Sequence, residues 1–243
     1  MKRNIISIVL ILAVVAVSIA GGCAKEGAAP PPLEEEKVIK IMGTFDLTGP
    51  ASTVDIYDSQ GFLDYIRYVN EEKGGINGIR VEPIVTDNHY ETEKCIAALK
   101  QAEEEGCVLM FTDITKANEA MKPMYEEAKI PVITITTSSV TLFPPGWIFC
   151  ETPTYAEGVA VTIDYYLSHI WKGSEPPKMA FVGPDNAYGR APYELGSKYA
   201  REKGIKDIYT AWTPYNPVDC TPFLLKFKSE GVNLIYSQGV TCS

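Results

Sequence analysis

The feature that most constrains this chain is an alternation of short apolar runs with amphipathic helical patterns. Four apolar runs rich in β-branched residues each end in a polar turn, and they span 38–45, 81–86, 108–111 and 131–135. Helical spacings of apolar residues span 54–72, 91–105 and 117–128. Strands that alternate with helices in this way predict a parallel sheet covered by helices.

The same alternation starts again after a break rich in proline and glycine. Pro144, Gly146 and Pro153 surround a short extended piece at 147–150. The elements expected beyond it are helices at 156–171, 190–203 and 221–229 and strands at 179–182, 208–212 and 233–236. We therefore predict two α/β lobes, at 37–150 and 151–243. The last strand would lack a covering helix, so we expect the second lobe, and the chain, to be incomplete relative to the fold.

The first residues are typical of a lipoprotein signal. Lys2 and Arg3 precede an apolar stretch from Ile5 to Ala20, and Gly21-Gly22-Cys23 follows. This pattern predicts a signal peptide at 1–22 and a lipid on Cys23. The alternative is a retained signal anchor, although the apolar stretch is shorter than the roughly 20 residues of a membrane-spanning helix. Residues 23–36 contain three prolines and an acidic run, and we expect a flexible tether between the lipid and the lobes.

Charge and composition exclude several classes of protein. The net charge of −9 and the absence of a basic stripe argue against nucleic acid as a partner. His89 and His169 are the only histidines, and no Cys-x-x-Cys pair occurs, so neither a metal site nor a cofactor is expected. Motifs for a nucleophile elbow or a phosphate loop are absent as well, so we expect no enzyme. The cysteines leave two readings open, a disulfide or buried free thiols.

The segment from Lys178 to Gly189 marks a candidate site. Its apolar run stops at Gly183-Pro184-Asp185-Asn186, and a helical pattern follows Tyr188. Ligands of open α/β sheets bind outside the carboxyl ends of the strands, which is where Asp185 and Tyr188 fall. The alternative is an ordinary turn in which the aspartate starts the helix.

With these elements placed, the sequence resembles the type 1 periplasmic binding proteins, the superfamily of the leucine/isoleucine/valine-binding proteins of ATP-driven transporters. The resemblance runs from about Val38 to Val240. Its motifs are Asp46-Leu47-Thr48-Gly49-Pro50, Gly74-Gly75-Ile76-Asn77-Gly78, Glu126 to Ile133, and Asp185-Asn186-Ala187-Tyr188-Gly189. It implies two Rossmann-like lobes that close on a ligand.

The resemblance also implies ligand-binding residues. The hydroxyl contact of the family after the third strand falls at Thr115, those after the fourth strand at Thr136 and Ser138, and the second-lobe tyrosine at Tyr188. Hydroxyls would bind the carboxylate of an α-amino acid, and no carboxylate is assigned to its ammonium group. Two alternatives remain: Thr115 as a helix N-cap and Ser138 as an ordinary loop hydroxyl.

The function that follows from the resemblance is solute capture outside the cytoplasm. We expect a lipid-anchored binding protein that takes up a small solute, a branched-chain or related amino acid, and delivers it to the permease and ATPase subunits of an ABC transporter. The alternatives are a ligand-sensing module for a membrane receptor and a truncated remnant that binds nothing.

Overall fold

The computed structural model describes residues 37–239. The predicted signal peptide, the tether and the lipidation site at Cys23 lie outside the described residues. The first strands and helices are β1 (Val38–Phe45), α2 (Ser52–Glu72), β2 (Arg80–Asp87), α3 (Thr92–Glu104), β3 (Leu109–Thr112), α4 (Thr115–Ala128), β4 (Val132–Thr134), α5 (Ser139–Leu142) and β5 (Ile148–Cys150). They are followed by α6 (Tyr155–Tyr165), a π-helical turn (Tyr166–Ile170), β6 (Met179–Pro184), α7 (Ala187–Glu202), β7 (Ile208–Thr213), α8 (Thr221–Glu230) and β8 (Leu234–Ser237).

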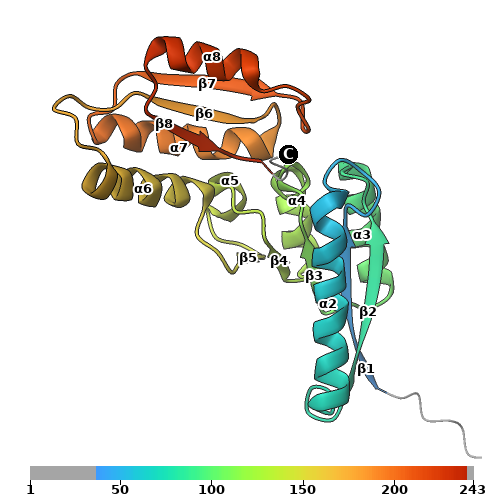
Figure 1. The fold of residues 1–243 in the computed structure, drawn as a ribbon. Coiled ribbons are helices and arrows are strands. Elements are labelled where there is room, and N and C mark those ends of the chain that lie inside the picture. Colours follow the sequence, from blue (N-terminus) through green and yellow to red (C-terminus); the bar gives the residue numbers. More distant parts are fainter. Residues whose placement is uncertain (1–36, 240–243) are drawn as a thin grey trace, which may run out of the picture. The chain divides into compact units, whose positions relative to one another are not determined.

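The strands form two separate parallel sheets, as the alternation predicts. The first has the order β2-β1-β3-β4-β5 and the second the order β7-β6-β8. In each sheet the first strand pairs with the second strand on one side and with the third strand on its other side. Right-handed crossovers then place successive helices on opposite faces. In Figure 1, α7 and α8 accordingly lie on opposite faces of the second sheet.

The two faces of the first sheet follow from the strict alternation of side chains along a strand. Met42 and Met110, which are register partners in β1 and β3, face α3 and α4. Phe45 and Phe111 lie on the other face, where the ring of Phe45 is 5.6 Å from that of Phe62 on α2. The apolar sides of these helices therefore cover both faces of the sheet.

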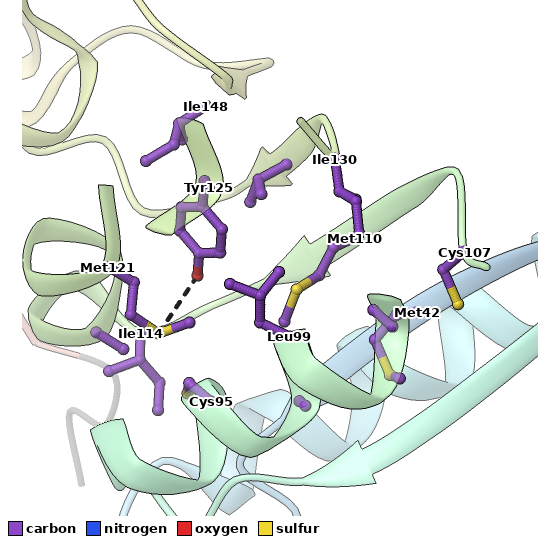
Figure 2. Close-up of a cluster of buried hydrophobic side chains, with 14 residues drawn as sticks. Met42, Cys95, Leu99, Cys107, Met110, Ile114, Met121, Tyr125, Ile130 and Ile148 are labelled. Atoms are coloured by element: carbon purple, nitrogen blue, oxygen red, sulfur yellow. Dashed lines mark hydrogen bonds between the residues drawn. The ribbon is translucent and has the colours of Figure 1, made fainter. Parts of the chain in front are cut away.

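The main core cluster lies between the first sheet and helices α3 and α4. Figure 2 shows Leu99, Met110 and Met121 converging there around the ring of Tyr125, all of them fully or almost fully buried. The Tyr125 hydroxyl donates to the Met121 sulfur at 3.7 Å, so this buried polar atom has a partner. A second cluster joins α6 and α7 to β6 through Val159, Ile163, Met179, Phe181 and Ala200.

A glycine ends α3. Gly106 has φ of +69°, a left-handed conformation that glycine adopts without steric cost. This lets the N–H groups of Gly106 and Cys107 donate to the carbonyls of Glu103 and Ala102. The pattern is a Schellman motif, which satisfies the last carbonyls of the helix and turns the chain toward β3.

The predicted helix at 156–171 differs from the structure in its last part. Regular α-helix ends at Tyr165, and residues 166–170 form a π-helical turn. The Ser168 hydroxyl donates to the carbonyl of Asp164 at 2.6 Å and so competes with the regular backbone ladder. The helix at 139–142 was not predicted, because four residues are too few to show a helical period.

Among the described residues Cys95, Cys107, Cys150 and Cys220 are free thiols. Burial raises the pKa of Cys95 to about 12, so this cysteine is an inert part of the core. Within residues 37–239 no helix is long and apolar enough to cross a membrane.

Candidate functional site

A cavity of about 180 Å³ lies at the carboxyl ends of β1, β2 and β3. The strand order places it at the point where the chain reverses its direction across the sheet, between β1 and β3. Loops that leave adjacent strands in opposite directions open a crevice there, and ligands of open α/β sheets bind in such crevices. Its lining combines four tyrosines, two aspartates and two threonines with Ala51, Val54 and Ile135.

The loop after β1 builds one wall. The buried Asp46 carboxylate accepts hydrogen bonds from the backbone N–H groups of Gly49 and Ala51, at 2.5 and 2.7 Å. These bonds fix the loop just before α2, and the first turn of that helix lines the cavity with Val54 and Asp55. Asp55 lies in this turn and is 5% exposed.

Two carboxyl groups meet at the cavity wall, Asp55 from α2 and Asp113 from the loop after β3. The backbone N–H of Asp46 lies 3.3 Å from Oδ2 of each. Burial is the main cause that raises the pKa of Asp55, to about 6. Burial and the neighbouring charge of Asp55 raise the pKa of Asp113 well above its ordinary value. The hydrogen bond between the two carboxyl groups lowers the pKa of Asp55 and raises that of Asp113, so Asp55 is the member of the pair that ionises first.

Four tyrosine rings form the rest of the wall in two perpendicular pairs. Tyr90 and Tyr215 have ring centroids 5.1 Å apart, and Tyr155 and Tyr188 have centroids 5.6 Å apart. Tyr90 follows β2, and Tyr188 and Tyr215 follow strands of the second sheet. Loops and helix starts that follow strands of both sheets thus supply aromatic surface to one cavity.

The backbone that presents Tyr90 is strained. His89 and Tyr90 have φ of +49° and +60°, in a region that bulky residues rarely adopt. Asn88 fixes the turn, because its Oδ1 accepts from the Tyr90 N–H at 2.9 Å and its Nδ2 donates to Asp113 Oδ1 at 3.1 Å. The turn therefore couples the placement of Tyr90 to the acidic pair. Strain of this kind gathers at ligand-binding sites.

A buried threonine network ends at the cavity. Asn118 Nδ2 donates to the hydroxyls of Thr134 and Thr136, at 2.9 and 2.8 Å. Thr134 also accepts from the Thr136 N–H at 3.0 Å, which fills both its lone pairs, so its own proton goes to the Thr136 oxygen at 2.8 Å. The Thr136 oxygen then has two donors, and its own proton is left for an acceptor in the cavity.

Three of the five predicted ligand residues, Thr115, Thr136 and Tyr188, line this cavity. Thr115 is the first residue of α4, and its hydroxyl is 3.5 Å from that of Tyr155. The alternative reading of Thr115 as an N-cap is wrong, since Ile114 is the N-cap and no side chain caps this helix.

The structure places the other two residues elsewhere. The Ser138 hydroxyl donates to Glu119 Oε1 at 2.5 Å and also caps α5, so Ser138 is more than an ordinary loop hydroxyl. It lines a separate cavity of about 150 Å³, with Glu119 and Arg190. The Asp185 carboxylate lies just before the start of α7 and accepts from Arg190 Nε at 2.6 Å. Asn186, not Asp185, caps that helix.

A larger cavity, of about 270 Å³, lies between α8 and the carboxyl ends of β6, β7 and β8. No charged side chain lines it. The smaller cavity, with its strained turn, buried carboxyl pair and converging hydroxyls, is the better candidate for a specific ligand site.

The family model of the periplasmic binding proteins matches residues 38–242. The chain belongs to this family. The predicted type 1 fold is confirmed, and the members of the family are substrate-binding proteins of ABC transporters that act outside the cytoplasm. No curated protein matches the sequence.

Solved structures agree with this assignment. A branched-chain amino acid ABC transporter protein from Thermus thermophilus with bound valine is 25% identical, with a TM-score of 0.77 over 84% of this chain and 53% of its own. A leucine-binding protein from Thermotoga maritima is 19% identical, with a TM-score of 0.68 over 82% and 56%. A fatty acid ABC transporter substrate-binding protein from Thermomonospora curvata is also 19% identical, with a TM-score of 0.73 over 88% and 54%. The chain thus spans about half the length of these proteins.

Proposed function

We propose that this chain is the substrate-binding component of an ABC transporter, capturing a branched-chain or related amino acid and delivering it to a membrane permease and its ATPase. The observation that carries the proposal is the cavity at the switch point of the first sheet. It gathers polar and aromatic side chains from the loops and helix starts that follow strands of both sheets. The structural neighbour with bound valine supports the class of solute.

The proposed mechanism is closure around the solute. Tyr188 and Tyr215 come from the second sheet, whereas Asp55 and Thr136 come from the first. A solute that contacts both groups favours the arrangement in which they are close together, and the permease would recognise that arrangement. The proposal includes a lipid on Cys23 that keeps the protein at the outer face of a membrane, and it involves binding without catalysis.

Tyr188→Ala tests the proposal. Isothermal titration calorimetry with valine should show a dissociation constant at least about tenfold higher than that of the unchanged chain, because a wall of the site is removed. The matched control is Tyr57→Ala, since Tyr57 is 75% exposed on α2 and should leave binding unchanged. An unchanged dissociation constant in Tyr188→Ala would remove this residue from the site.

A further inference from the structure

We propose that the cavity selects solutes with a positively charged nitrogen, and that Asp55 is the residue that contacts this nitrogen. The inference rests on the proposed function and narrows its class of solute. The sequence offers no carboxylate for such a group by resemblance, whereas the structure brings two carboxyl groups to the cavity wall.

The charges around the cavity favour a cation. Its lining contains Asp55 and Asp113 but no lysine, arginine or histidine. With a pKa of about 6, Asp55 is ionised at neutral pH, and no side chain of the lining neutralises its charge. A cationic solute would supply the missing counter-charge, whereas a solute with only a carboxylate would bring a second negative charge beside the first.

The aromatic walls favour an organic cation over a metal ion. Four tyrosines line the space, and a cationic nitrogen is attracted to the face of such a ring. Within the described part of the chain no group of three or more histidine, cysteine, aspartate or glutamate side chains is placed to hold a metal. At about 180 Å³ the cavity is slightly larger than an engineered one of about 150 Å³ that holds benzene, so a solute of about six to eight non-hydrogen atoms would fit.

The threonine network provides an independent sign of a ligand. Thr136 is 5% exposed and lines the cavity, and the proton of its hydroxyl has no acceptor within the network. An acceptor atom of the solute could therefore take this proton, while the Thr136 oxygen keeps its bonds to Asn118 and Thr134. The site therefore offers an acceptor, Asp55, and a donor, Thr136, to two different ends of one small solute.

A set of three probes of similar shape separates the two ends. Valine carries both charged groups, isobutylamine carries only the ammonium group, and isovalerate carries only the carboxylate. Calorimetric titrations at pH 7.5 should show binding of valine and isobutylamine, with isovalerate at least about tenfold weaker than valine. Asp55→Asn should weaken valine and isobutylamine by about tenfold or more. Asp64→Asn, with the same change of charge on an exposed part of α2, should weaken neither.

The outcomes distinguish the inference from the proposed function. Isovalerate that binds as tightly as valine, or isobutylamine that binds Asp55→Asn as tightly as the unchanged chain, overturns the cation site while leaving solute capture intact. If none of the three probes binds the unchanged chain, the proposed function fails and the cation site fails with it.

Discussion

Replacing Asp55 with asparagine should stabilise the folded chain at neutral pH. Burial raises the pKa of this carboxyl from 3.8 to about 6, so the folded state holds its proton more tightly than the unfolded chain does. The free energy of unfolding is therefore highest below about pH 4 and falls as the pH rises toward about 6. A shift of roughly 2 pKa units at 1.36 kcal/mol each corresponds to about 3 kcal/mol of stability lost by pH 8.

Asparagine has nearly the same shape and cannot ionise, so it removes this loss. We expect Asp55→Asn to be about 2–3 kcal/mol more stable than the unchanged chain at pH 8 and to differ little from it at pH 4. Its oxygen can still accept from the Asp46 N–H. Urea unfolding at several values of pH between 4 and 8 would measure both free energies and their difference.

Neighbouring titratable groups set the controls for this experiment. Asp113 shares a hydrogen bond with Asp55, and Asp46 and Asp58 contribute negative charge nearby. Asp64→Asn is the matched control, because it makes the same replacement at an exposed position of the same helix. If Asp55→Asn is destabilising at pH 8, or if its effect is the same at pH 4 and pH 8, then burial does not strain the carboxyl and the reasoning is wrong.

Two further predictions concern packing, and each is checked by urea unfolding. Gly189→Ala should cost about 1–3 kcal/mol, because its new Cβ would meet the Pro184 carbonyl, whereas Gly61→Ala, with nothing near its Cβ on exposed α2, should gain about 0.5–1 kcal/mol. Equal effects of the two glycine changes would contradict the crowding at the start of α7. Leu99→Ala should cost about 2–5 kcal/mol, since Leu99 is 1% exposed in the main core, while exposed Lys100→Ala serves as its control. If Leu99→Ala lowers the free energy of unfolding by less than about 1 kcal/mol, neighbouring side chains must move to fill the cavity that the substitution leaves.

The fold could be predicted because its signals are local. The apolar run at 38–45 is matched residue for residue by β1. The π-helical turn after Tyr165 escaped prediction because apolar spacing does not report which carbonyl a serine hydroxyl captures. Such competition depends on side-chain geometry that a periodic pattern leaves open.

The site could be predicted only in part. Thr115 and Thr136 follow from the resemblance to the family, Tyr188 follows both from it and from its place after a strand, and all three line one cavity. Asp113 stands directly after β3, so the rule that placed Tyr188 at the end of a strand could have found Asp113 as well. Asp55 could not be found in this way, since on a helix an aspartate is usually a solvated residue, and its burial depends on the packing of α2 against the loop after β3.

Asp87 and Asp55 show why the location of a carboxylate alone does not decide its role. Burial acts to raise the pKa of Asp87, but hydrogen bonds from the Thr48 hydroxyl and the N–H groups of His89 and Leu47 outweigh burial and lower it. Its charge is satisfied by the loop it fixes, so a ligand would gain little there. The charge of Asp55 is opposed by burial and by neighbouring carboxylates, and it lies against an open space.

The stability that Asp55 costs the protein and its proposed role in binding therefore have the same cause, a buried carboxylate without a counter-charge. A carboxylate without a counter-charge lowers stability while the cavity is empty, and binding of a cation would recover that loss as affinity. The asparagine variant should accordingly be the more stable protein and the poorer binder. A variant that gained stability at pH 8 and also kept its affinity for isobutylamine would show that the strained carboxylate and the binding group are different residues.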